Sequence, residues 1–308
     1  MKSRKFAQDI LHHCYQRSAD GGVLFYDFID HLVYFTLFCT LAREYDITVL
    51  AACQMPDHIH DSVRTSRKEN LVKFKRTLNA RFAKQYNSRC SIHGPVFESP
   101  FGSAPKYGDK KARSNLIYVW NNPVERKLVR YAEEYRWNFL AYAISSHPFS
   151  KEIVIRRASK AMLSAIKIVK SEHAAGRPLG YTLIRNLIRP LSPEELEQFI
   201  DIVISTYNII DFEAAIRFFG SFAALLVATH STTGNEYDLN ETFVGQSDKP
   251  YAEMTQILLE ECGFKDIHEM LTLDNDAKRN LFDILRRRTF VLAKQIAKFL
   301  HLPIDRFL

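Results

Sequence analysis

The chain has 308 residues with 42 Lys and Arg against 35 Asp and Glu, a formal net charge of +7. Hydrophobic residues make up 46% of it and glycine only 11 positions, which excludes a disordered or fibrous protein and predicts one large or two ordinary globular domains. The basic excess lies in residues 1–150, which hold 22 basic and 14 acidic residues, and within them in residues 64–89, whose local charge is +8. Such a run predicts a polyanionic partner, nucleic acid first, although it can equally be a solvated helix face.

Five cysteines are scattered along the chain without a CxxC pair, so neither a zinc site nor a disulfide framework is predicted. The longest apolar stretch, around 218–228, is shorter than the roughly 20 residues that span a bilayer. The N-terminal residues lack the apolar core of a signal peptide. We therefore expect a cytoplasmic protein with no membrane partner, associated with the nucleoid when it binds DNA.

Strand and helix signals alternate in the first half of the chain. Strands are predicted at 10–16, 47–53 and around 58–60, and helices at 28–44, at 66–86 and from about 113 onward. A stretch rich in Gly and Pro at 93–105 is typical of a loop. The order β-α-β-β-α predicts an α+β domain over 1–147, with an antiparallel sheet and helices on one face.

The second half is predicted to be an all-helical region over 148–308. Helices are expected at 151–173, 193–205, 211–228, 251–262 and as a pair within 277–300. Ser192, with Glu195 three residues later, is typical of a capping box. Three arginines precede residues 290–303, which resemble the first helix and turn of a helix-turn-helix, so a truncated DNA-binding element at 286–308 and an ordinary packed helix are both open. With almost no net charge, this half could instead make protein contacts or cover the active site.

Two short constellations carry chemistry. His58 and His60 stand two apart in a predicted strand and therefore share one face, where they could bind a divalent cation or be ordinary core or surface residues. Tyr118 and Asn122 stand four apart on a predicted helix and share a face as well. Beside the histidines they would form a nucleophile next to a metal, whereas in isolation Tyr118 is typical of a core edge and Asn-Pro of a helix end.

Taken together, these motifs resemble the single-tyrosine HUH transposases of small insertion sequences, including the REP-associated tyrosine transposases. Residues 55–60 read Met-Pro-Asp-His-Ile-His, similar to the family's Met-Pro-Asn-His-Val-His, and residues 118–124 are similar to its Tyr-Ile-x-x-Asn-Pro-Val. The Pro-Val-Phe at 95–97, the Glu-Glu-Tyr-Arg-Trp at 133–137 and Gln16-Arg17 also fit, so the resemblance covers roughly 8–140.

The resemblance implies a ferredoxin-like or RRM-like HUH catalytic domain that cleaves and rejoins single-stranded DNA through a 5′-phosphotyrosine. It assigns His58 and His60 to a Mg²⁺ or Mn²⁺ ion, Tyr118 to the nucleophile and Asn122 to the third metal ligand. Other candidates for that ligand are His93, Gln54 and Glu98. The expected partner is single-stranded DNA or a DNA hairpin, and a homodimer is one option for the assembly.

The sequence departs from the family pattern at two places, and a proline next to Asn122 could affect a third. Asp57 replaces the usual Asn, and Asp61-Ser62 replace the common Leu-Leu after the histidine motif. Pro123 disfavours helical backbone at Asn122 and could turn that side chain away from Tyr118, although the family has the same Asn-Pro.

Cations around these motifs are the expected DNA contacts. They are Arg17 after the first strand, Lys110, Lys111 and Arg113 ahead of Tyr118, and, on the basic helix, Arg67, Lys73, Arg76, Arg81 and Lys84. Trp120, Phe97 and Phe101 are candidate stacking platforms for bases, with a place in the core as the alternative for each.

Two other functions remain open at this stage. A domesticated, catalytically idle relative would bind hairpin DNA or RNA as a regulator through the same basic helix. A replication-initiating HUH endonuclease or relaxase would share the chemistry, but often has a second tyrosine, and Tyr118 has none on its helix face.

Overall fold

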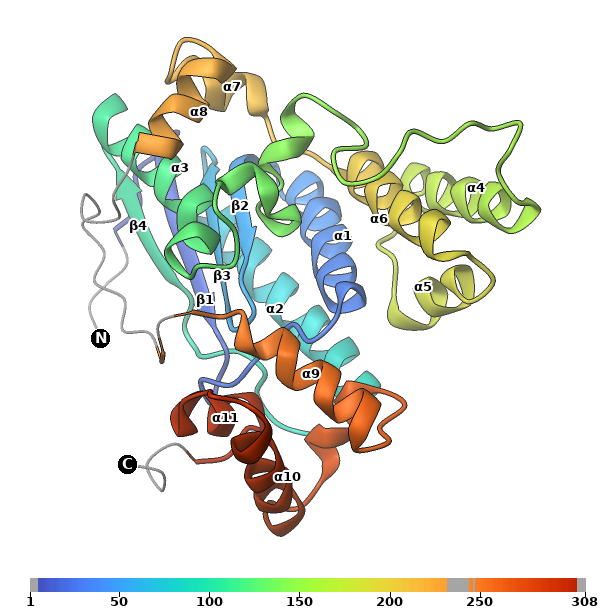
Figure 1. Cartoon of the computed structure of the whole chain (residues 1–308). Helices are drawn as coiled ribbons and strands as arrows, with labels where there is room; N and C mark the ends of the chain where they lie inside the picture. Colours follow the sequence, from blue (N-terminus) through green and yellow to red (C-terminus); the bar gives the residue numbers. More distant parts are fainter. Residues whose placement is uncertain (1–4, 232–243, 246, 304–308) are drawn as a thin grey trace.

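Four antiparallel strands form one sheet in the order β2-β3-β1-β4. The structure is a computed structural model that describes residues 5–231, 244–245 and 247–303. The strands are β1 (Leu11–Arg17), β2 (Thr48–Gln54), β3 (His58–Arg64) and β4 (Gly102–Lys106). Helices α1 (Phe28–Glu44) and α2 (Lys68–Cys90) share one face, as predicted for all the helices of this domain, whereas α3 (Gly108–Glu125) lies on the other face (Figure 1). The predicted α+β class is confirmed.

Side chains of β3 alternate between these two helical layers. The carboxylate of Asp61 forms an ion pair with Lys75 of α2 on one face. The next residue, Ser62, donates to the amide oxygen of Asn115 of α3 on the other face, at 2.8 Å. Because successive residues of a strand point to opposite faces, His58 and His60 must lie on the α3 side with Ser62.

Local chemistry explains why α1 begins at Phe28, as predicted. The Asp27 side chain accepts hydrogen bonds from the backbone of Ile29 and Asp30, and the Asp30 carboxylate accepts from the backbone of Asp27, which completes a capping box. The helix is apolar nearly all round because the sheet and α2 lie on some of its sides and the second half of the chain on others.

The edge strand β4 is the one strand that the sequence does not predict. It contains Gly102 and Pro105, and both residues are typical breakers of regular structure. At the edge of a sheet a proline is tolerated, because only one side of the strand needs ladder hydrogen bonds, and β4 pairs with β1 alone. The prediction of a loop over 93–105 is therefore wrong for its last residues.

The second half of the chain is helical, as predicted, with different boundaries. Its elements are the 3₁₀ turn η4 (Ile267–Thr272) and the helices α4 (Lys160–Ala174), α5 (Tyr181–Ile188), α6 (Pro193–Tyr207), α7 (Phe212–Arg217), α8 (Phe222–Ser231), α9 (Pro250–Glu261), α10 (Asn275–Arg288) and α11 (Ala293–Phe299). Three further 3₁₀ turns follow α3 within the first half: η1 (Ala132–Glu134), η2 (Arg136–Asn138) and η3 (Leu140–Ala143). The helix expected at 211–228 is two helices, because Gly220 between them adopts a φ of +85°. The capping box of Ser192 and Glu195 is present.

These helices form separate groups around the sheet (Figure 1). Helices α4 to α6 lie beside α1, α7 and α8 lie near α3, and α9 to α11 gather at one end of the sheet. Residues 286–308, the possible truncated helix-turn-helix, contain the end of α10 and all of α11. Residues 304–308 of this segment lie outside the described part of the chain. No helix in the described ranges is long and apolar enough to cross a membrane.

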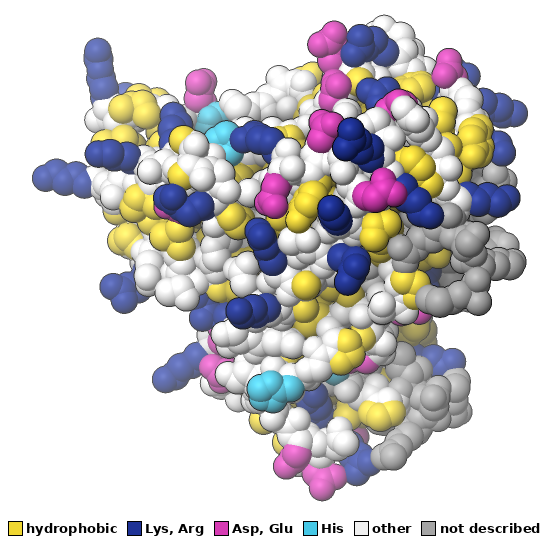
Figure 2. All heavy atoms as spheres, turned by 180° about the vertical axis from the view of Figure 1, so that it is seen from behind, with side chains coloured by type: hydrophobic (Ala, Val, Ile, Leu, Met, Phe, Trp, Pro, Cys, Tyr) yellow, Lys and Arg dark blue, Asp and Glu magenta, His cyan; other side chains and the backbone are white. Residues whose placement is uncertain are grey.

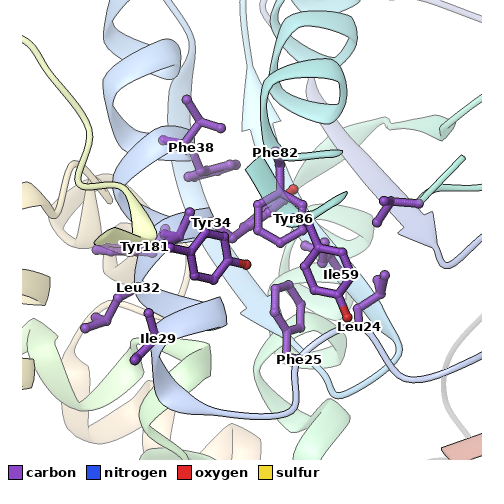
Figure 3. Close-up of a cluster of buried hydrophobic side chains, with 14 of the residues drawn as sticks. Leu24, Phe25, Ile29, Leu32, Tyr34, Phe38, Ile59, Phe82, Tyr86 and Tyr181 are labelled. Atoms are coloured by element: carbon purple, nitrogen blue, oxygen red, sulfur yellow. The ribbon is translucent and has the colours of Figure 1, made fainter. Parts of the chain in front are cut away.

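One buried cluster joins the two halves of the chain. Phe25, Tyr34 and Phe82 pack as a group, with ring centroids of Tyr34 and Phe82 5.2 Å apart and their planes nearly perpendicular (Figure 3). Tyr181 of α5 reaches this cluster, and its hydroxyl donates to Asp30 at 2.9 Å. The predicted division into domains near residue 147 stays a prediction, and side chains from both sides of it share this core.

Candidate active site

Both histidines of the Met-Pro-Asp-His-Ile-His segment meet helix α3. Their rings lie 4.9 Å apart, centroid to centroid, and nearly perpendicular. Nε2 of His58 lies 3.1 Å from Oδ1 of Asn122, and the ring of Tyr118 lies 5.2 Å from that of His60 in an edge-on arrangement. The structure therefore brings together the two strand residues and the two helix residues that the motifs singled out. All four are buried, and only 2% of Tyr118 is exposed.

Pro123 does not turn Asn122 away from the histidines. Helix α3 continues through the proline to Glu125, and the Asn122 amide nitrogen donates to the backbone carbonyl of Tyr118 at 3.3 Å. This bond leaves the Asn122 amide oxygen directed at His58. The helical spacing of Tyr118 and Asn122 is thus preserved across the Asn-Pro step.

The surroundings of His58 suit a cation. Nδ1 of His58 donates to Oδ1 of Asp57 at 2.6 Å, which in a neutral imidazole leaves a lone pair on Nε2 facing the Asn122 oxygen. Two acceptors at this distance need positive charge near them, either a second proton on His58 or a metal ion. A carboxylate behind a histidine is the usual support of a metal-binding imidazole. Imidazole nitrogens are common ligands of divalent transition metals, and an amide oxygen is a donor of the kind that suits Mg²⁺ and Mn²⁺.

Asp57 is held as a carboxylate. Burial alone would raise its pKa, but His58 and Lys298 beside it hold the pKa well below its usual range. Within the described ranges, no three His, Cys, Asp or Glu side chains are grouped to hold a metal ion. The amide oxygen of Asn122 is the side-chain oxygen that faces Nε2 of His58, at 3.1 Å.

The other candidates for the third ligand point elsewhere. Nδ1 of His31 on α1 donates to the amide oxygen of Gln54 at 2.8 Å, on the opposite side of the sheet from α3. His93 and Glu98 are exposed residues in the segment between α2 and β4.

Two residues of β1 belong to the site and were not singled out in the sequence. Nε2 of His13 lies 2.9 Å from Nδ1 of His60, and the His13 ring lies 5.5 Å from that of Tyr118. Tyr15 stands directly across from His60 in the β1–β3 register and is 38% exposed. The signal that could have found them is the alternation of the predicted first strand, which places residues 13, 15 and 17 on one face.

Tyr15 owes its position to a glycine on the edge strand. It pairs with Gly102 of β4, and a Cβ atom at that position would lie 2.0 Å from the Tyr15 ring. The ring therefore lies over bare backbone, which explains why a glycine is present in this strand.

The predicted DNA contacts fall into two groups. Arg17 stands directly across from His58 in the strand register and so lies at the site. Lys110, Lys111 and Arg113 are exposed on the first turns of α3, the helix that carries Tyr118.

The cations of α2 are not brought to this site. Its exposed cations lie on the far side of the sheet from Tyr118, where Lys and Arg side chains are spread over the rear face of the molecule (Figure 2). They include Lys73, Arg76, Arg81 and Lys84, and Arg67 is exposed immediately before the helix. Two further cations of the basic run have carboxylate partners within the protein, since Lys75 pairs with Asp61 and Arg89 with Asp266. The local charge of the sequence therefore overstates the charge available to a ligand.

The three aromatic candidates for base stacking lie in the core. Trp120 is fully buried, and Phe97 and Phe101 are only 7% and 6% exposed. Each therefore takes the structural alternative, and the exposed aromatic ring at the site is that of Tyr15.

No model of a protein family and no curated protein sequence matches this chain. One solved structure that it is similar to is that of a REP-associated tyrosine transposase bound to a REP hairpin, with 12% sequence identity, a TM-score of 0.40, and coverage of 47% of this chain and 84% of that one.

Proposed function

We propose that this protein is a transposase-like endonuclease and strand transferase that cleaves and rejoins single-stranded DNA with Tyr118 as the nucleophile. The observation that carries the proposal is the packing of Tyr118 against His60, on the same face of the sheet as the His58–Asn122 contact. A phenol beside imidazoles and an amide oxygen matches the needs of phosphoryl transfer to a side chain.

The reaction follows from the atoms available. The Tyr118 oxygen attacks a backbone phosphorus, a new P–O bond forms, and the bond from phosphorus to the 3′ oxygen breaks. The phenol proton passes to solvent, and a proton from solvent completes the 3′-OH. Because the 5′-phosphotyrosine is a phosphodiester like the bond it replaces, a second 3′-OH can reverse the step without an energy source.

The roles of the other residues follow from their contacts. His58, His60 and Asn122 would hold a Mg²⁺ or Mn²⁺ ion, which when bound supplies charge that stabilises the transferring phosphate in its transition state. Arg17, at the site, would contact a phosphate of the bound strand. Because Tyr118 is buried, part of the covering chain must move before a phosphate reaches it.

The cations of α3 and of α2 would contact different parts of a DNA that extends beyond the active site. Lys110, Lys111 and Arg113 are on the same helix as Tyr118 and would hold the strand near the scissile phosphate. The exposed cations of α2 would hold a more distant part of a DNA hairpin, since the sheet separates them from Tyr118.

The experiment uses labelled single-stranded DNA from the flanks of the protein's own coding region. The protein is incubated with it in Mg²⁺ or in EDTA, and the products are separated on a denaturing gel. A covalent, slower band that requires Mg²⁺ is expected for the wild type and for Tyr107→Phe, whose tyrosine is exposed before α3. Tyr118→Phe should bind the DNA without forming the band.

Two outcomes would overturn the proposal. A covalent band with Tyr118→Phe would exclude this residue as the nucleophile. DNA binding that survives His58→Ala with His60→Ala, together with no covalent band for the wild type in any metal, would identify a binding protein instead.

A further inference from the structure

The last described helix reaches the candidate active site through one side chain. Lys298 of α11 forms an ion pair with Oδ2 of Asp57, and Oδ1 of the same carboxylate accepts the Nδ1 hydrogen of His58 at 2.6 Å. His58 in turn faces Asn122 through Nε2. A continuous chain of polar contacts therefore runs from α11 through Asp57 and His58 to α3.

This chain is sheltered from solvent. The side chains of Lys298 and Asp57 are only 9% and 14% exposed. An ion pair with this little solvent is screened weakly, and the loss of one partner leaves a charge with poor hydration. Lys298 therefore stabilises the Asp57 carboxylate much more strongly than a solvent-exposed cation would.

The segment around α11 is anchored on both sides of the site. Gln295 of α11 donates to the backbone of Ser247 at 2.7 Å. Arg126, the residue after α3, donates to the carboxylate of the adjoining Asp248 at 2.6 Å and to the backbone of Gly245 at 3.1 Å. The helical second half thus contacts the residue before β3 and the end of α3, the two elements that carry the site.

The presence of Asp at position 57 explains why a cation lies beside it. A neutral Asn at position 57 could accept the His58 hydrogen without any counterion, whereas a sheltered carboxylate needs a nearby cation. In this chain position 57 is Asp, and the cation comes from a helix 241 residues further along.

We propose that Lys298 is a positioning residue for the metal ligand His58, and that the helical second half completes the metal site through it. The inference rests on the proposed function for the identity of the site. Lys298 holds the Asp57 carboxylate in the orientation that binds Nδ1 of His58, so that Nε2 points to the metal position. Without it, Asp57 turns toward solvent or another cation, and the imidazole loses its fixed orientation.

The first experiment measures the affinity of the protein for Mn²⁺ in the absence of DNA. The electron paramagnetic resonance signal of unbound Mn²⁺ reports how much of the ion is free. Removal of a supporting group of this kind lowers metal affinity by about 10-fold to 100-fold, so we expect Lys298→Met to do so. Lys294→Met, an exposed lysine on the same helix, should bind Mn²⁺ like the wild type. Thermal unfolding checks that both variants are folded, and Lys298→Arg should retain most of the affinity.

A double-mutant cycle shows whether Lys298 acts through Asp57. In an Asp57→Asn background, Lys298→Met should change Mn²⁺ affinity less than about 2-fold, since the carboxylate that it positions is gone. Equal affinity of Lys298→Met and Lys294→Met would overturn the inference, as would an undiminished effect of Lys298→Met in the Asp57→Asn background.

The covalent band separates this inference from the proposed function. Lys298→Met should need a higher Mn²⁺ concentration for half-maximal band formation, with the maximal yield restored at saturating metal. If the wild type binds Mn²⁺ through His58 and forms no band, the proposed function fails while the role of Lys298 stands. If His58→Ala leaves Mn²⁺ binding unchanged, the site itself is wrong and both proposals fall.

Discussion

Nε2 of His13 on β1 lies 2.9 Å from Nδ1 of His60 on β3, so a second histidine stands behind one of the two histidines of the motif. A hydrogen bond at one ring nitrogen determines which tautomer the other presents. His60 is thus oriented by β1, as His58 is oriented by Asp57.

Replacing His13 should weaken metal binding while the fold is retained. We expect His13→Gln to lower Mn²⁺ affinity about 10-fold, because His60 loses the partner that orients its ring. The control is His12→Gln, since His12 is equally buried, points to the other face of the sheet and bonds the backbone of Ile10. Titration of both variants with Mn²⁺ checks this, and equal affinities would contradict the role of His13.

Tyr15 should contribute to DNA binding by stacking on a base. Stacking on an aromatic ring contributes about 1–3 kcal/mol per base, so Tyr15→Leu should weaken binding of single-stranded DNA by roughly 10-fold or more. Tyr15→Phe keeps the ring and should bind like the wild type. Fluorescence anisotropy with a labelled oligonucleotide measures this, and equal weakening by both variants would exclude stacking in favour of the hydroxyl.

The two groups of cations should differ in what they affect. A variant with Gln at Lys73, Arg76, Arg81 and Lys84 should bind hairpin DNA more weakly. Its affinity should also depend less on salt: the slope of log affinity against log salt concentration should fall by about 0.7 to 0.9 for each phosphate that is no longer neutralised. The yield of covalent product from DNA that is already bound should stay the same. Replacing Lys110, Lys111 and Arg113 by Gln should lower that yield as well, and the reverse pattern would place the scissile strand on α2.

The buried Lys75–Asp61 pair should be sensitive to the loss of one partner. Both side chains are at most 1% exposed, and burial raises the pKa of Asp61 even though Lys75 opposes this. Lys75→Met leaves the carboxyl group without its cation and should lower the free energy of unfolding by about 3–5 kcal/mol. In contrast, Lys73→Met on the exposed face of the same helix should change it by less than about 0.5 kcal/mol. Urea denaturation measures both, and recovery in Lys75→Met with Asp61→Leu would confirm the pairwise origin.

Stability should fall at alkaline pH because of His268 in η4. Burial alone would lower the pKa of His268, but Asp30 and Asp266 raise it to about 10. A raised pKa means that the stabilisation is complete below the unfolded value of about 6.5 and is lost as the pH rises through about 10.

Between pH 6.5 and about pH 10, His268 lowers the free energy of unfolding by about 1.4 kcal/mol for each unit of pH increase, because only the folded state keeps the proton. Denaturation at pH 7 to 9.5 should show this slope for the wild type and for His93→Gln, whose histidine is exposed. His268→Gln should be less stable at pH 7 and lack this part of the slope. Parallel curves for wild type and His268→Gln would contradict the assignment.

Local periodicity was sufficient for much of the fold and for the motif residues. The bounds of α1 were predicted at about 28–44 from its apolar repeat, which is local. The i, i+2 spacing of His58 and His60 and the i, i+4 spacing of Tyr118 and Asn122 correctly indicated which side chains share a face. Strand β4 was missed because a strand that contains Gly102 and Pro105 is tolerated only at an edge, and edges are a property of the whole sheet.

The sequence by itself determined the order of the first three strands and of the helices between them, the two chemical motifs and the excess of positive charge in the first half. Only the tertiary structure decided that α3 covers the face of the sheet opposite α2, which separates the basic helix from Tyr118. It alone placed His13 behind His60 and Lys298 behind Asp57. Both contacts join residues that are distant in the chain, and such pairs are set by strand register and helix packing, which no local repeat of side chains encodes.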